Sequence, residues 1–224
     1  DRAGLSTTAG FSLTVNSASS NQAPINLSLS NTSIAENLPS GTVVGTLTTT
    51  DPNPGDTFTY SLVSGTGSTD NGFFTIVDNT LRTNQAFNFE DKSSYSIRVR
   101  TDDGRGGSFE RVLSIAVLDR NDAPIVATPI SNRTATAGRS FRYTVPANTF
   151  FDEDVEANDD LDSLTLRATL NDGRALPNWL RFNASTGTFS GTPTSGNIGT
   201  LNIAVRAIDR AGAAASSTFT LVVR

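Results

Sequence analysis

Residues 95–107 have the sequence Tyr-Ser-Ile-Arg-Val-Arg-Thr-Asp-Asp-Gly-Arg-Gly-Gly. From Tyr95 to Arg100 apolar and polar side chains alternate, as in a β-strand with one buried face. The glycine-rich end, residues 103–107, is typical of a tight turn. Other alternating segments occur at 58–62, 201–206 and 219–223, and no segment has a clear period of 3.6 residues. The sequence therefore predicts an all-β protein built from immunoglobulin-like Greek-key β-sandwiches.

The composition of the 224-residue chain excludes several kinds of site. It contains no Cys and no His, which excludes disulfides, thiol nucleophiles and His-based triads or metal ligation. A net charge of −5 with a single lysine, Lys92, argues against nucleic acid as a partner. No apolar run approaches the ~18 residues of a membrane span, so we expect no direct membrane insertion. The low charge content, the abundant Thr, Ser and Gly and the lack of Met are typical of a piece of a longer secreted or cell-surface protein.

An internal repeat predicts the domain organisation. Residues 1–4, Asp-Arg-Ala-Gly, recur as residues 209–212, and Phe11, Leu13 and Val15 match residues 219, 221 and 223 at the same offset of 208. Residues 1–20 are therefore predicted to be the last strand of a preceding domain plus a linker, followed by whole domains at 21–124 and 125–224. We expect this leftover strand to be disordered or paired with another chain, because its edge would otherwise be unpaired.

Two stretches share a linker pattern. Asn-Gln-Ala-Pro-Ile at 21–25 precedes the first domain, and Asn-Asp-Ala-Pro-Ile at 121–125 precedes the second. Proline fixes its own φ and restricts the residue before it to extended backbone, so both linkers are predicted to be short and stiff. The sequence thus predicts two tandem β-sandwiches whose joint can hold groups from both domains at one place.

Acidic residues are concentrated in a short stretch. Residues 23–124 hold 12 acidic and seven basic residues, whereas 125–224 hold nine of each. Seven of those last nine acids lie between 152 and 162, with no basic residue among them. The run fits a solvated loop, which is the commoner case, or a cation site, because carboxylates are calcium ligands.

Residues 23–124 resemble a cadherin repeat. The resemblance rests on four pieces in the family's order: Ala35-Glu36-Asn37, Phe87-Asn88-Phe89-Glu90, Thr101-Asp102-Asp103-Gly104 and Asp119-Arg120-Asn121-Asp122-Ala123-Pro124. Residues 125–224 resemble the dystroglycan-type cadherin-like domain, an immunoglobulin-like relative. Here the matching stretches are 141–146, 151–154, 176–180 and 187–193.

In cadherins, calcium ions lie at the junction between successive repeats. The resemblance implies two or three Ca²⁺ at the 124/125 joint, because each ion takes six to eight oxygen ligands and so many ligands exceed the needs of one ion. The first domain and the linker would supply Glu36, Asn88, Glu90, Asp119, Asn121 and Asp122, and the second domain would supply Asp152, Asp154 and Asp209. Asn88 stands where the family usually has Asp, so one site is expected to be weaker.

Five further residues are weaker candidates. Four of them could form a half-site at the start of the first domain: Asp51, Asn53, Asp56 and Asp103. The linker before this domain, residues 16–22, contains no acid, so we expect that half-site to be empty or weak. The fifth candidate, Asp162, follows a stretch that resembles an insertion, residues 155–161.

The leading hypothesis is a calcium-binding adhesion or spacer segment of a long extracellular or cell-surface repeat protein, without catalysis, from a source that the mixed array suggests is bacterial. Its expected partners are neighbouring repeats of the same chain, with like chains or a polysaccharide as further options. The alternative is a calcium-dependent carbohydrate-binding module, which would need an exposed aromatic platform. Trp179, the only tryptophan, is flanked by apolar residues and is expected in a sandwich core instead. A carboxylate-pair hydrolase is rejected because nothing marks a cleft.

Overall fold

The structure, a computed structural model, describes residues 4, 8–10, 20–156 and 163–224. The chain forms two compact units. The first comprises residues 1–87 and 92–118, and the second comprises residues 88–91 and 119–224. Residues 88–91 thus belong to the second unit, although the sequence on either side of them belongs to the first.

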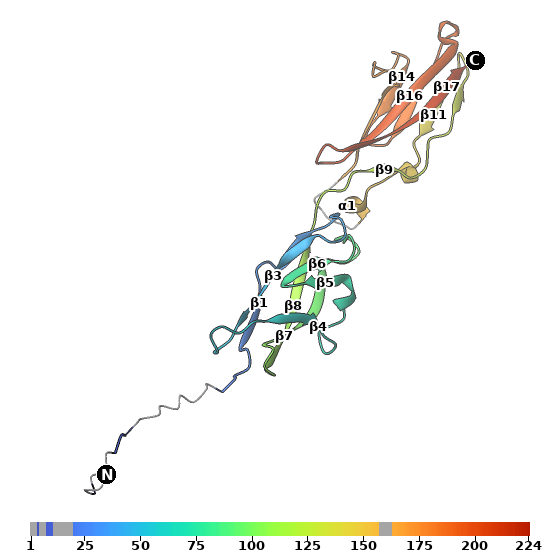
Figure 1. Ribbon diagram of the computed structural model, residues 1–224. Coiled ribbons are helices and arrows are strands. Elements are labelled where there is room, and N and C mark those ends of the chain that lie inside the picture. Colours follow the sequence, from blue (N-terminus) through green and yellow to red (C-terminus); the bar gives the residue numbers. More distant parts are fainter. Residues whose placement is uncertain (1–3, 5–7, 11–19, 157–162) are drawn as a thin grey trace. The chain divides into compact units, whose positions relative to one another are not determined.

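The first unit is a sandwich of two four-stranded sheets (Figure 1). One sheet has the order β1-β3-β6-β5, with bounds Asn26–Leu29, Val43–Thr50, Thr80–Thr83 and Phe74–Val77. The other has the order β2-β8-β7-β4, with bounds Ser33–Ala35, Ser108–Leu118, Ser94–Asp102 and Thr59–Leu62. A short 3-10 helix, η1 (Asn71–Phe73), precedes β5. All neighbours are antiparallel except β2 and β8, which run parallel.

Alternation along β7 builds the core of the first unit. Tyr95, Ile97 and Val99 are buried, and their register places Tyr95 opposite Ile115 and Ile97 opposite Leu113 on β8. The strand predicted at 95–100 is therefore confirmed. Burial of such side chains contributes roughly 1.5–3 kcal/mol each, which makes this face the main stabilising feature of the sheet.

A buried carboxylate, Asp70, holds η1 against β7 and pairs with the partly exposed Lys92. The Asp70 carboxylate accepts hydrogen bonds from the Ser96 N–H at 2.7 Å and from Lys92 Nζ at 2.5 Å. Lys92 Nζ also lies 4.8 Å from the centre of the Tyr95 ring. Burial alone would raise the pKa of Asp70, but the hydrogen bonds from Lys92 and Ser96 outweigh it and lower the pKa below 3.8. Asp70 is therefore a buried carboxylate that already has its counter-charge.

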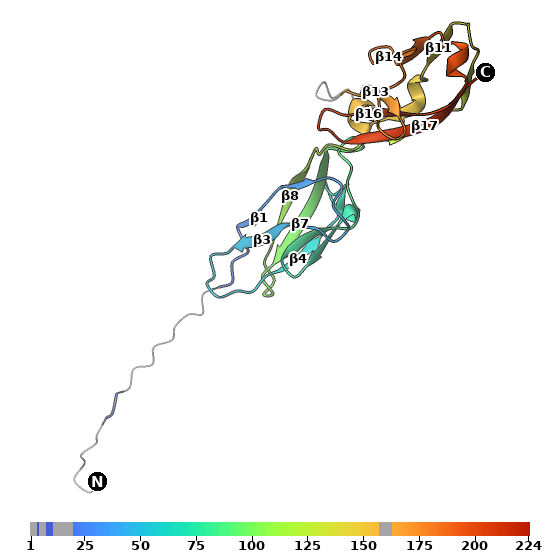
Figure 2. The same ribbon diagram turned by 90° about the horizontal axis from the view of Figure 1, so that it is seen from above.

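The second unit contains a four-stranded sheet, a three-stranded sheet and a two-stranded ribbon (Figure 2). The four-stranded sheet has the order β10-β17-β16-β13, with bounds Arg133–Ala135, Ala214–Val223, Gly199–Ile208 and Thr165–Leu170. The three-stranded sheet has the order β11-β15-β14, with bounds Phe141–Thr144, Thr188–Gly191 and Leu180–Asn183. The ribbon pairs β12 (Phe150–Phe151) with β9 (Ile125–Val126). The short helices are η2 (Ala147–Thr149), α1 (Glu153–Glu156) and η3 (Ser195–Asn197).

Trp179 packs against the core of the second unit, as the sequence predicted. It lies partly buried beside a cluster that includes Leu180, Phe189 and Phe219. Gly191 on β15 lies so close to the Trp179 carbonyl that an added Cβ would overlap it. The tryptophan therefore contributes to packing at the edge of this core, and part of its surface stays accessible.

Two sequence predictions fall outside the described residues. These are the leftover strand, most of whose residues lie in the gaps before residue 20, and the candidate ligand Asp162. Both stay predictions. In the part of the chain that the structure describes, no helix is long and apolar enough to cross a membrane.

Candidate metal centre

The first acidic cluster consists of Asp51, Asp56 and Asp103, all in the first unit. Asp51 and Asp56 lie on the loop between β3 and β4, and Asp103 lies on the turn between β7 and β8. The register of β4 and β7 pairs Thr59 with Asp102, which brings these two loops to the same end of the sheet. One carboxylate oxygen from each Asp lies within 4.8 Å of the others. Since ligands of one Ca²⁺ at ~2.3–2.6 Å can be no more than about 5 Å apart, this spacing fits a single ion.

The β7–β8 turn holds the Asp103 carboxylate in place. Its Oδ1 accepts hydrogen bonds from the backbone N–H groups of Arg105 at 2.8 Å and of Gly107 at 2.9 Å. Its Oδ2 accepts a hydrogen bond from Asn21 Nδ2 at 2.9 Å. The bond from Asn21, with the two backbone bonds and the nearby Arg105 charge, lowers the pKa of Asp103 below 3.8 despite burial. A Cβ on Gly107 would overlap both this carboxylate and Ala23, so the position requires glycine.

The other two carboxylates of the first cluster have unused oxygen atoms. The Asp56 side chain is fully buried, and neither of its oxygens has a hydrogen-bond partner. Asp51 Oδ1 accepts the Asn53 N–H at 2.7 Å, but the buried Asp51 Oδ2 has no partner. Arg105 Nη1 offsets part of the negative charge at Asp56 Oδ1, 3.2 Å away. Buried carboxylate oxygens without hydrogen-bond partners are costly, and a bound cation would offset that cost. The donor set, made only of oxygen, fits calcium.

Asn53 ties this loop to the linker before the domain. Its Oδ1 accepts the Gln22 N–H at 2.7 Å, and its Nδ2 donates to the Ser20 carbonyl at 3.4 Å. Together with the Asn21–Asp103 bond, these contacts attach the linker to the loops that carry the carboxylates. The linker predicted from its proline is thus fixed by polar contacts as well.

The second acidic cluster consists of Glu90, Asp122 and Glu153, all in the second unit. They come from residues 88–91, from the linker and from the start of α1, and one oxygen of each lies within 4.8 Å of the others. Asn88 reaches the same place, because its Nδ2 donates to Glu153 Oε1 at 2.9 Å. Three stretches that are far apart in the sequence therefore meet at one point.

Two other predicted ligands accept hydrogen bonds from linker residues at the second cluster. The Asp122 N–H donates to Asp154 Oδ2 at 2.8 Å, and Asn121 Nδ2 donates to Asp209 Oδ2 at 3.0 Å. Asp209 follows β16, and its Oδ1 accepts the Ala213 N–H at 2.8 Å. Three aspartates of this group are almost fully buried: Asp152, Asp154 and Asp209. The acidic run after residue 151 therefore begins with buried carboxylates, which argues against a purely solvated loop.

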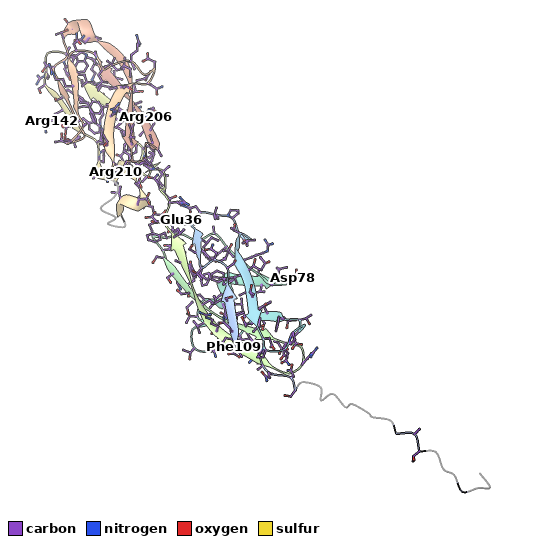
Figure 3. All side chains as sticks on the ribbon, turned by 90° about the vertical axis from the view of Figure 1, so that its left-hand side faces the viewer. Glu36, Asp78, Phe109, Arg142, Arg206 and Arg210 are labelled. Carbon is purple, nitrogen blue, oxygen red and sulfur yellow. The ribbon has the colours of Figure 1, made fainter. Side chains whose placement is uncertain are left out.

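The other two predicted ligands are Glu36 and Asp119. Glu36 follows β2 in the first unit, where it is 2% exposed and its N–H donates to the Leu118 carbonyl at 3.1 Å. Leu118 ends β8, so Glu36 lies at the opposite end of this strand from the Asp103 turn (Figure 3 labels Glu36 and, near that turn, Phe109). Asp119 is exposed and belongs to the second unit.

Two residues of these sites were not predicted from the sequence. Glu153 was counted in the acidic run, but the resemblance assigned ligand roles only to its neighbours Asp152 and Asp154. Its longer side chain and its place inside the run were the available signals. The second residue, Arg105, contacts Asp56. In the sequence it stands only in a glycine-rich turn, and no sequence pattern links it to Asp56.

The two halves of the chain match two family profiles. Residues 30–118 match the cadherin domain, and residues 123–224 match the family described as "Putative Ig domain". These matches agree with the cadherin and immunoglobulin-like parts of the sequence prediction. They do not test its dystroglycan-type detail.

Individual proteins give a similar result. The chain is 35% identical over 107 residues to protocadherin gamma-B6 of human and of chimpanzee, covering 45% of this chain and 11% of each relative. Human protocadherin-24 EC1-2 aligns with a TM-score of 0.62 and 17% identity over 91% of this chain and 100% of that one. Mouse cadherin-23 EC22-24 aligns with a TM-score of 0.55 and 22% identity over 92% and 65%. The structural likenesses support the fold of two tandem immunoglobulin-like sandwiches.

Proposed function

We infer that this chain, a cadherin domain at residues 30–118 followed by an immunoglobulin-like domain at 123–224, is a calcium-binding segment of an extracellular adhesion protein. The relatives are cadherins by name, and the chain spans only 11% of the curated ones. The proposal therefore concerns this segment and its calcium sites.

The second cluster is the observation that carries the proposal. Glu90, Asp122 and Glu153 offer oxygens at a spacing that one Ca²⁺ can span, and the buried Asp152, Asp154 and Asp209 lie in the same unit. So many carboxylates in one place repel one another unless a cation offsets their charge. The resemblance to cadherins adds Glu36 and Asp119 and supports two or three ions in all.

Calcium bound here would supply positive charge and a rigid coordination shell. The residues of the chain orient the carboxylates by hydrogen bonds: Asn88 orients Glu153, the Asp122 N–H orients Asp154, and Asn121 orients Asp209. Because the ligands come from the sequences of both domains and from the linker, we propose that binding limits the motion of the joint. The mechanical role would be that of a stiff spacer between neighbouring repeats.

Thermal unfolding tests calcium binding. Sites with dissociation constants of ~10⁻⁴–10⁻³ M would add roughly 1–3 kcal/mol each in a few millimolar CaCl₂, which raises the Tm by several degrees over EGTA. The rise should shrink in Glu90→Gln and in Glu153→Gln. Asp78→Asn is the matched control, because Asp78 is exposed and its φ of 55° suits Asn equally. An equal Tm in EGTA and in CaCl₂ would contradict the proposal.

Joint rigidity needs a distance measurement. The chain contains no Cys, so Ala116→Cys in β8 and Thr218→Cys in β17, both exposed positions, allow one spin label in each unit. The distance distribution should be narrow in CaCl₂ and broad in EGTA, and Glu153→Gln should keep it broad. A distribution that calcium leaves unchanged would reject the spacer role while leaving metal binding intact.

Four finer assignments accompany this proposal. The second domain is of the dystroglycan type, the protein is secreted or on the cell surface of a bacterium, neighbouring repeats contact this segment, and like chains are its adhesion partners. The carbohydrate-binding alternative gains no support, because Trp179 packs against a core. A pull-down between differently tagged copies, with and without calcium, tests the partner assignment.

A further inference from the structure

Arg105 is the only basic side chain that pairs with the first cluster, counting the described residues. Its Nη1 lies 3.2 Å from Asp56 Oδ1, and its backbone N–H donates to Asp103 Oδ1. The Arg105 side chain is 59% exposed, whereas the Asp56 side chain is fully buried. The guanidinium group thus reaches from solvent to a buried carboxylate.

The contact between Arg105 and Asp56 changes the net charge of the first cluster. Asp51, Asp56 and Asp103 carry three negative charges when ionised, and Arg105 offsets one of them. The remainder equals the charge of one divalent cation. A calcium ion among these carboxylates would lie close to the guanidinium, and the two cations would repel each other.

We propose that Arg105 is a built-in counter-charge that lowers the calcium affinity of the first cluster. This inference rests on the proposed calcium binding of the chain. In the calcium-free protein, Arg105 offsets part of the cost of burying Asp56. Whatever stabilises the calcium-free state relative to the bound state weakens binding by the same free energy. Arg105 therefore sets the first cluster to respond at higher calcium concentration.

The geometry of the pair suits an exchangeable contact. Neither Asp56 oxygen accepts a hydrogen bond, so the guanidinium is held by charge alone. Glu110 shows the contrast, since it accepts hydrogen bonds from Arg98 Nε at 2.7 Å and Arg100 Nε at 2.9 Å. An exposed guanidinium without directional bonds can return to water when an ion enters, whereas the Glu110 arrangement, which has a further bond from Arg100 Nη2, would lose three charge-assisted bonds.

Direct binding measurements on the full chain test this inference. A Glu90→Gln/Glu153→Gln background weakens the second cluster, so that the remaining sites report mainly on the first, and equilibrium dialysis with ⁴⁵Ca²⁺ at fixed ionic strength gives affinity and stoichiometry. Arg105→Ala should bind calcium about tenfold more tightly, from the repulsion expected between a divalent ion and a solvated unit charge ~6 Å away at a water-like dielectric constant of ~80. It should also lower the Tm in EGTA. Arg105→Lys should stay close to the background protein.

The matched control is Arg82→Ala. It removes the same charge from the first unit, but Arg82 pairs with Val43 at the start of β3, and Asp51 follows the far end of that strand. Calcium affinity should change less than about twofold, because the charges are separated by more than a Debye length. Arg105→Gln replaces the alanine variant if that variant does not fold.

The outcomes separate this inference from the proposed function. If Asp51→Asn and Asp103→Asn leave calcium binding unchanged in the background protein, the first cluster is no calcium site and this inference fails, while the proposed function, which is carried by the second cluster, is untouched. If those variants lose binding while Arg105→Ala binds calcium equally or more weakly, only the role of Arg105 is overturned. Tighter binding in both Arg105→Ala and Arg82→Ala would indicate a general charge effect and would also overturn it.

Discussion

The first cluster takes its carboxylates from two loops that one pair of neighbouring strands brings together, whereas the second takes them from three stretches spread along the chain. In the first, Asp103 is fixed by bonds from its own turn, and Arg105 supplies a counter-charge. In the second, the side-chain amide of Asn88 donates to Glu153, and that of Asn121 donates to Asp209, which lies outside the cluster itself. The same ligand chemistry can therefore depend on the fold of one sandwich or on the meeting of distant segments.

This difference makes the second cluster more dependent on the fold of the second unit. The first cluster should form whenever the first unit folds, since Asp51, Asp56 and Asp103 all lie on loops between its strands. Variants that damage one unit and spare the other test whether the two clusters form independently.

Gly191→Ala should separate the clusters most strongly. The added Cβ overlaps the Trp179 carbonyl, and because this is backbone the sheet itself must shift, at a cost of about 3 kcal/mol or more in the second unit. Calorimetry should show the transition of the second unit moving down while that of the first keeps its calcium response. Gly196→Ala is the control, since its Cβ would meet only Thr194 Oγ1 at 3.7 Å. Loss of calcium binding at both clusters would show that the units do not fold independently.

Asp70→Asn should destabilise the first unit by about 2 kcal/mol, because it removes the charge from a buried carboxylate that is hydrogen-bonded to Lys92 and to the Ser96 N–H. The loss should be the same in EGTA and in CaCl₂, as Asp70 already has its counter-charge. The pKa of Asp70 is lowered in the folded state, so its contribution is present above about pH 4 and is lost as pH falls through the folded-state pKa. Urea unfolding at pH 7 and pH 3 checks both points. A calcium-dependent loss would be unexpected.

Asp56→Asn should weaken calcium binding at the first cluster about tenfold, or ~1.4 kcal/mol, and leave the second unchanged. The neutral amide keeps the size of the side chain but removes a buried ligand charge. Isothermal titration in the Glu90→Gln/Glu153→Gln background measures the effect. Unchanged affinity would mean that Asp56 serves only its contact with Arg105.

Asp172→Asn should have the smallest effect on stability, close to the error of the measurement, because its pair with Arg174 is largely solvated. The two side chains are 51% and 77% exposed. Chemical denaturation with and without calcium should give curves close to those of the unchanged protein. A larger loss would indicate that this turn, residues 171–173, matters more to the second unit than its exposure suggests.

Much of the fold could be predicted from the chain alone. Alternation located β7 to within a residue or two of its observed bounds, and it assigned Ile97 and Val99 to the buried face. The apolar neighbours of Trp179 predicted a place in a core, and the structure shows it partly buried against that core. These features depend on local periodicity and burial, which the order of residues encodes directly.

The sequence by itself determined the β class, the two domains and the supply of carboxylates, because each is a matter of pattern or composition. Only the tertiary structure decided which acids meet. It placed Glu153 with Glu90 and Asp122, and it set Arg105 against Asp56. The physical reason is that a cation responds to distances of a few ångströms through space. Strand register and loop path set those distances, and neither is visible in the spacing of residues along the chain.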